Sequence, residues 1–223
     1  MQIKICGLYR DVDADHANAS KPDYVGFILD FPKSHRNVSI GKAAEIRKRL
    51  DPGIKAVGVF VDKDIDYVLE AVEEIGLDVV QLHGHEDNVY IEELRTILDR
   101  DEMQPAGDDA KAGTSKDHKV RIWKAFKVTS EEDIAAAEKC KADLVLLDGG
   151  SGEGRSFNWQ LAKGLGRPFA LAGGLDLDNL CEAIKNLCPV LVDISSGVET
   201  DKAKDPDKMI KAVNLVRNVS SDI

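Results

Sequence analysis

The chain has 223 residues, of which 43% are hydrophobic and 31% charged, and its formal net charge is -10. This apolar content is enough to bury a sizeable core without help from metals or disulfides. An acidic chain without a segregated basic face is a poor partner for nucleic acid. No apolar run approaches the about eighteen residues of a membrane span, and no signal-peptide pattern opens the chain, so we expect no membrane association and a cytoplasmic location.

The cysteines show no metal or disulfide pattern. They lack C-x-x-C spacing and the density of a small secreted scaffold, which indicates free thiols in a reducing compartment. Histidines and carboxylates do not converge in spacings typical of a metal site either, so we expect no bound metal. The four cysteines are Cys6, Cys140, Cys181 and Cys188.

Short apolar runs rich in β-formers alternate with helical patterns along the chain, which predicts repeated βα units and a parallel sheet. The predicted strands are 2–6, 24–29, 55–61, 79–82, 120–126, 144–147, 169–172 and 190–194. The clearer helices are predicted at 40–50, 65–75, 89–98, 130–139, 177–187 and 206–217, with weaker patterns near 12–19 and 159–165. Ser39 and Ser130 are candidate helix caps.

Residues 100–119 break this pattern, because they are rich in Asp, Lys, Gly and Ser and have almost no apolar side chains. We predict an exposed, mobile insertion there. Eight βα units in this length favour a single domain, residues 1–223, folded as a closed α/β (β/α)8 TIM barrel. An open, doubly wound sheet is the alternative.

In both architectures ligands bind at the carboxyl ends of the strands. Two glycine-containing loops follow the last two predicted strands, where backbone N–H groups can approach a phosphate closely. They comprise Gly173, Gly174, Ser195, Ser196 and Gly197. We therefore predict a small phosphorylated ligand, although tight turns alone would also explain these glycines.

Four side chains at other strand ends are candidates for chemistry. Cys6 ends the first strand, and a cation or helix N-terminus that lowered its pKa would make it a base or nucleophile; an inert core thiol is the alternative. Asp148 follows a buried strand as either a general acid or a loop-capping acceptor. Arg36 can bind a carboxylate bidentately or carry surface charge, and His83 can contact ligand or pack as a neutral ring.

These strings, in this order, resemble the phosphoribosylanthranilate isomerase family over nearly the whole chain except 100–119. The early motifs are Lys4-Ile5-Cys6-Gly7-Leu8, Asp23-Tyr24-Val25-Gly26-Phe27-Ile28, Ser34-His35-Arg36-Asn37-Val38, Val57-Gly58-Val59-Phe60 and Gln81-Leu82-His83-Gly84. The later ones are Leu146-Leu147-Asp148, Ser156-Phe157-Asn158-Trp159, Leu171-Ala172-Gly173-Gly174-Leu175 and Val192-Asp193-Ile194-Ser195-Ser196-Gly197-Val198-Glu199. The joint match is highly specific.

The resemblance implies a (β/α)8 barrel of tryptophan biosynthesis that needs no cofactor and performs an Amadori rearrangement of N-(5-phosphoribosyl)anthranilate. By matched position, Asp148 would be the general acid that opens the sugar ring, and Cys6 the base that takes the C2′ proton. Arg36 would bind the anthranilate carboxylate, and the two glycine loops the phosphate. The resemblance leaves a monomer or a homodimer open.

Two places depart from the family pattern. Tyr9 stands where a small hydroxyl residue is usual, and the loop 150–156 differs from the commoner Gly-Gly-Thr-Gly-Lys-Thr form.

Two other functions remain as alternatives. One is the bifunctional isomerase that also rearranges a histidine precursor, whose chemistry relies on a carboxylate pair where this chain has Cys6. The other is a non-catalytic ligand-binding barrel.

Overall fold

The computed structural model describes residues 1–101, 119–149 and 159–219. Its central element is a parallel sheet in the order β1-β9-β8-β7-β6-β5-β4-β2-β3, which closes because β1 also pairs with β2. The strands are β1 Gln2–Cys6, β2 Tyr24–Leu29, β3 Asn37–Val38, β4 Lys55–Phe60, β5 Val79–Leu82, β6 Arg121–Lys127, β7 Leu144–Asp148, β8 Phe169–Ala172 and β9 Leu191–Ile194. With the two-residue β3 set aside, eight strands form the predicted closed barrel, and the open-sheet alternative is wrong.

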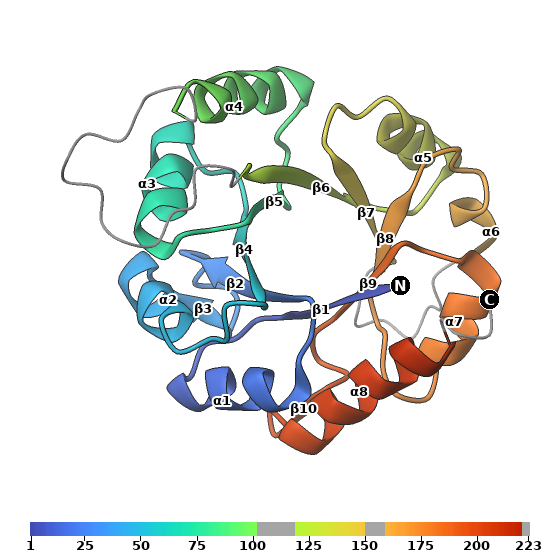
Figure 1. The fold of residues 1–223 in the computed structure, drawn as a ribbon. Coiled ribbons are helices and arrows are strands. Elements are labelled where there is room, and N and C mark those ends of the chain that lie inside the picture. The colour runs from blue at the N-terminus through green and yellow to red at the C-terminus, as the bar shows by residue number, and fades with distance from the viewer. Residues whose placement is uncertain (102–118, 150–158, 220–223) are drawn as a thin grey trace.

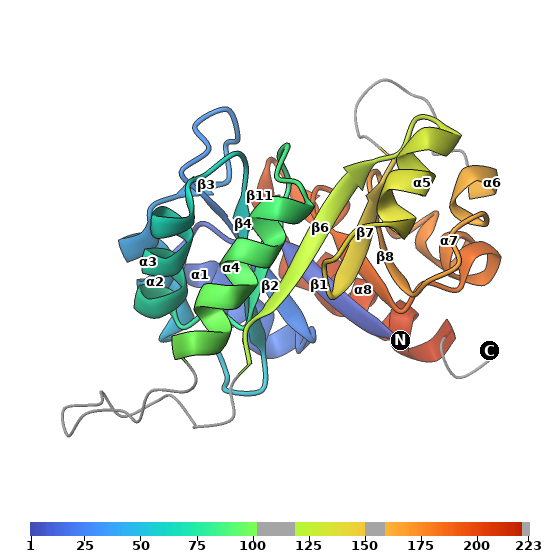
Figure 2. The same cartoon turned by 90° about the horizontal axis from the view of Figure 1, so that it is seen from above.

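Helices surround this barrel (Figure 1), and in the view turned by 90° the strands lie between α3 and α4 on one side and α5 to α7 on the other (Figure 2). They are α1 Asp11–Ser20, α2 Ile40–Arg47, α3 Ile65–Ile75, α4 Asn88–Asp101, α5 Glu131–Glu138, α6 Trp159–Ala162, α7 Leu180–Leu187 and α8 Pro206–Val219. A small antiparallel hairpin, β10 Glu199–Thr200 and β11 Ala203–Lys204, precedes α8. None of the helices within the described ranges is both long and apolar enough to cross a membrane.

Local signals explain several helix limits. Ser39 Oγ accepts a hydrogen bond from the Lys42 N–H at the start of α2, and Ser130 forms a capping box with Asp133 at the start of α5. The last residues predicted for the second helix instead form a turn, so α2 ends at Arg47. The predicted helix 177–187 begins three residues late, because Asp176 Oδ1 accepts from the backbone N–H groups of a preceding turn. The predicted insertion lies almost wholly outside the described residues.

Side-chain alternation along the strands produces two apolar clusters. One fills the space between strands and helices and includes Ile3 and Ile5 of β1. The other lies inside the barrel and includes Tyr24 and Trp123, whose rings pack edge to face with their centroids 5.0 Å apart. Because successive residues of a strand point to opposite faces, the alternate residues of β1, Lys4 among them, project into the barrel.

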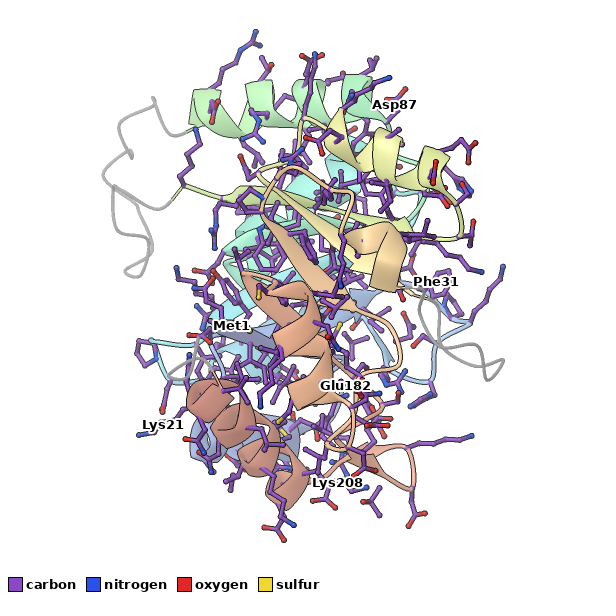
Figure 3. All side chains as sticks on the ribbon, turned by 90° about the vertical axis from the view of Figure 1, so that its right-hand side faces the viewer. Met1, Lys21, Phe31, Asp87, Glu182 and Lys208 are labelled. Atoms are coloured by element: carbon purple, nitrogen blue, oxygen red, sulfur yellow. The ribbon has the colours of Figure 1, made fainter. Side chains whose placement is uncertain are left out.

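All strands of the barrel sheet run in the same direction, so their carboxyl ends share one face of the barrel. Figure 3 makes this visible through labelled residues: Phe31 after β2 and Asp87 after β5 lie toward one side, and Met1 and Lys21, which precede β1 and β2, toward the other. The candidate site residues belong to the first of these faces.

Candidate active site

Cys6 is the last residue of β1 and is buried, with 8% of its surface exposed. Its carbonyl oxygen accepts a hydrogen bond from Ser195 Oγ at 3.0 Å, which joins the end of β1 to the loop after β9. The next residue, Gly7, has a φ of +86°, and a Cβ there would lie 2.3 Å from Arg36 Cδ. Gly7 therefore lets the Arg36 side chain lie across the chain directly beyond the thiol.

The pKa of Cys6 depends on its burial and on a neighbouring lysine. Burial raises the pKa of the Cys6 thiol, and the facing Lys4 ammonium counteracts this only in part. The sequence left open whether a nearby cation lowers this pKa; Lys4 is such a cation, but it does not reverse the effect of burial. Desolvation of a thiol 8% exposed outweighs the attraction of the cation for the thiolate.

Asp148 ends β7 and contacts His83, which directly follows β5. Asp148 Oδ2 lies 3.4 Å from His83 Nε2, although β6 separates the two strands in the sheet, so the contact passes over the end of β6. Gln81 Nε2 lies 3.1 Å from His83 Nδ1. With the amide as donor, Nδ1 accepts and Nε2 carries the proton that faces Asp148.

Arg36 lies in the loop between β2 and β3, and a carboxylate of this chain already binds it. Its Nε and Nη2 donate to Glu199 Oε1 and Oε2 at 2.6 and 2.7 Å, a bidentate pair. Lys204 Nζ also donates to Glu199 Oε1 at 2.7 Å and to the Ser195 carbonyl at 2.9 Å. Glu199 therefore ties the Arg36 loop to the β10–β11 hairpin.

The glycine loops after β8 and β9 lie against each other. Gly173 and Gly174 have φ values of +86° and +64°, a conformation that favours glycine. Gly197 pairs with Asp176 in an isolated bridge, and a Cβ on Gly197 would lie 2.1 Å from the Leu175 carbonyl oxygen. The absence of a side chain at Gly197 is thus what permits this close approach, which brings the two predicted phosphate loops together.

Together these residues form a polar rim with a thiol and a carboxyl that reach the mouth from non-adjacent strands, which suits acid–base chemistry on a bound molecule. Over the part of the chain that the structure describes, there is no group of three or more His, Cys, Asp or Glu side chains placed to hold a metal ion. The divergent loop at 150–156 lies outside the described residues.

A family model described as N-(5′-phosphoribosyl)anthranilate (PRA) isomerase matches residues 3–106 and 98–215. The chain belongs to the N-(5′-phosphoribosyl)anthranilate isomerase family. Two curated family members show the extent of the similarity. The isomerase of Clostridium acetobutylicum is 38% identical over 226 residues, covering 97% of this chain and 98% of that one. That of Endomicrobium trichonymphae is 39% identical over 223 residues, covering 98% and 99%.

Solved structures of N-(5′-phosphoribosyl)anthranilate isomerases have the same fold. The Thermotoga maritima enzyme matches with a TM-score of 0.79 and 31% identity, covering 98% of this chain and 99% of that chain. Another structure of the family contains reduced 1-(o-carboxyphenylamino)-1-deoxyribulose 5-phosphate and matches with a TM-score of 0.76 and 31% identity, again covering 98% and 99%. The resemblance found in the sequence motifs is confirmed.

Three polar residues of this family member were assigned no role from the sequence: Lys4, Glu199 and Lys204. The side chains of Lys4 and Lys204 have no exposed surface, and that of Glu199 is 6% exposed. Lys4 did give a signal, because a lysine between Ile3 and Ile5 in a buried strand must point into the barrel. The ion pair of Glu199 had no local signal, because its partner Arg36 is 163 residues away.

Proposed function

We propose that this chain catalyses the Amadori rearrangement of N-(5′-phosphoribosyl)anthranilate to 1-(2-carboxyphenylamino)-1-deoxyribulose 5-phosphate, a step of tryptophan biosynthesis. Family membership over nearly the full chain supports this substrate. The observation that carries the assignment of roles is that Cys6 and Asp148 end different strands, β1 and β7, on the same face of the barrel. A sugar bound between them would meet a base and an acid.

In the proposed reaction, Asp148 in its protonated form donates a proton to the furanose ring oxygen, and the C1′–O bond breaks to leave an iminium. The Cys6 thiolate then removes the C2′ proton, which gives an enolamine. The enolamine tautomerises to the ketone, and proton exchange with water restores both side chains. Because burial raises the pKa of Cys6, its thiolate is a stronger base than an exposed one would be.

The ends of the substrate would be held by separate groups. The Gly173–Gly174 loop and the Ser195–Ser196–Gly197 loop would bind the phosphate through backbone N–H groups. Arg36 would bind the anthranilate carboxylate with its Nη1–Nη2 edge, since Glu199 occupies the Nε–Nη2 edge. His83 would contact the substrate beside Asp148.

A thiol that serves as a base must stay reduced, which supports a cytoplasmic location for the proposed enzyme. The described cysteines are all free thiols. The proposed substrate is a small phosphorylated molecule, and the chemistry of the rim requires no nucleic acid, membrane or cofactor.

Two variants test the catalytic roles. Cys6→Ala and Asp148→Asn should each lower kcat by a factor of about 10² to 10⁴. Turnover is measured as the decrease in substrate fluorescence. Cys188→Ala, which removes an exposed thiol, is the matched control and should keep wild-type turnover. Near-wild-type kcat in either folded site variant would show that the assigned role is wrong.

The carboxylate site has a separate test. Arg36→Met should raise KM by about tenfold or more, because a charge-assisted bidentate contact to the anthranilate carboxylate is lost. An unchanged KM would exclude Arg36 from substrate binding.

The phosphate loop has its own test. Gly174→Ala, at a φ of +64°, should weaken the competitive inhibition by inorganic phosphate if this loop holds the phosphate group.

A further inference from the structure

A fully buried lysine lies beside the candidate base. Lys4 has no exposed surface, and its Nζ donates to Asp193 Oδ2 at 2.9 Å from the neighbouring strand β9. Lysine is almost never fully buried unless it is paired, and a buried ion pair is by itself weak evidence for stability, since apolar residues of similar volume do as well or better. Stability therefore does not explain why the Lys4–Asp193 ion pair is buried at this place in the barrel.

Gly26 of β2 shows how close Lys4 and Cys6 lie. A Cβ built on Gly26 would lie 2.8 Å from Cys6 Sγ, 3.0 Å from Lys4 Cε and 3.1 Å from Lys4 Nζ. The thiol and the ammonium therefore border the same small space inside the barrel. The missing side chain at Gly26 leaves room for both.

We propose that Lys4 is a positioning residue for the base: anchored by Asp193, its ammonium is held beside Cys6 Sγ and stabilises the thiolate that removes the substrate proton. This inference rests on the proposed function, in which Cys6 is the base. Lys4 gives up no proton in it. Burial by itself would lower the pKa of Lys4, but Asp193 and Cys6 outweigh it and raise the pKa, so the ammonium persists.

Among the charged groups around Cys6, Lys4 has the strongest effect on the thiolate. Asp193 of β9 acts in the opposite direction, Lys204 of β11 acts in the same direction more weakly, and Arg36 lies beyond Gly7. Burial raises the pKa of Cys6, Lys4 lowers it, and Asp193 raises it by less than Lys4 lowers it. Removing Lys4 and Asp193 together should therefore still destabilise the thiolate.

The test is the double variant Lys4→Met/Asp193→Leu, which leaves no unpaired buried charge. The thiol is titrated through thiolate absorbance near 240 nm, with the same protein carrying Cys6→Ala as the blank. We expect the thiol pKa to rise by about one unit. The matched control is Lys124→Met/Glu86→Gln, which removes a second buried pair, 3.2 Å apart, and should leave the Cys6 titration unchanged. An unchanged or lowered thiol pKa in the double variant would overturn the proposal.

A second measurement avoids replacing Lys4. In the wild type, the ¹⁵N resonance of the Lys4 ammonium should shift as Cys6 titrates, and in Cys6→Ser this shift should disappear. A Lys4 ¹⁵N chemical shift that does not change as Cys6 titrates would also overturn the proposal. Neither measurement requires turnover, so both test the effect of Lys4 on Cys6 separately from the proposed role of Cys6 as the base. If the thiol pKa moves but the acid limb of kcat/KM does not move with it, Cys6 is not the base and the proposed catalytic role fails, while the placement of Lys4 stands.

Discussion

The carboxylate of Glu199 holds two cations at once, and Glu199→Gln measures what this contributes. The variant keeps the shape of the side chain but removes its charge and turns an NH₂ group toward Arg36 or Lys204. Glu199 accepts at 2.6 and 2.7 Å from Arg36 and at 2.7 Å from Lys204, and its side chain is 6% exposed. Breaking a buried pair from one side costs about 3–5 kcal/mol. Because Arg36 is partly exposed, we expect the lower end, about 3 kcal/mol.

The cost should depend on pH. Burial alone would raise the pKa of Glu199, but hydrogen bonds from Arg36 and Lys204 outweigh it and lower the pKa below its usual value. A carboxyl whose pKa is lowered by folding stabilises the native state above its unfolded pKa, and this contribution is lost as the pH falls through the folded pKa. The difference between wild type and Glu199→Gln should therefore be full at pH 7 and shrink below about pH 4.

Urea unfolding followed by circular dichroism measures this difference at each pH. The control is Glu45→Gln, because Glu45 is 67% exposed in its pair with Lys42 and should contribute at most about 0.5 kcal/mol. A cost at pH 7 below about 1 kcal/mol for Glu199→Gln, or a difference that stays constant down to pH 3, would refute the argument that Glu199 is a buried anion held by two cations.

Two further variants probe packing and charge. Gly26→Ala would place a methyl group 2.8 Å from Cys6 Sγ, so we expect a loss of about 1–3 kcal/mol in urea unfolding together with a lower kcat. Gly53→Ala, where a Cβ has no neighbour within 4 Å, is its control, and equal effects would contradict the steric explanation. Lys124→Met leaves the Glu86 carboxylate buried without its cation and should cost about 3–5 kcal/mol; a loss under 1 kcal/mol would show that Glu86 needs no such partner.

Much of the fold is encoded in local sequence. The helix Ile65–Ile75 has the predicted limits because Asp64 accepts a hydrogen bond from the Tyr67 N–H at its start and Gly76 takes a left-handed conformation at its end. The strands Val79–Leu82 and Phe169–Ala172 also match their predictions, because both are buried runs that end at a polar residue, a proline or a glycine. The short strands β3, β10 and β11 were missed, because two residues are too few to show a periodic pattern.

Part of the candidate site could also be predicted from the sequence, and part could not. Cys6 and Asp148 could be identified from position, because a parallel sheet places the carboxyl ends of its strands on one face. Their assigned roles stay predictions, as do those of Arg36, His83 and the glycine loops. The environment of Cys6 could not be predicted, since the direction of its pKa shift depends on how far burial exceeds the effect of Lys4.

The sequence alone determined the order of the βα units, the family and the residues at the strand ends, because propensity, capping and apolar patterns act between near neighbours. Only the tertiary structure decided which charges meet. Lys4 and Asp193 are 189 residues apart, and Arg36 and Glu199 are 163 apart, yet barrel closure brings each pair within hydrogen-bonding distance. The pairing of β1 with β9 sets the first contact, and the loops at the barrel mouth set the second.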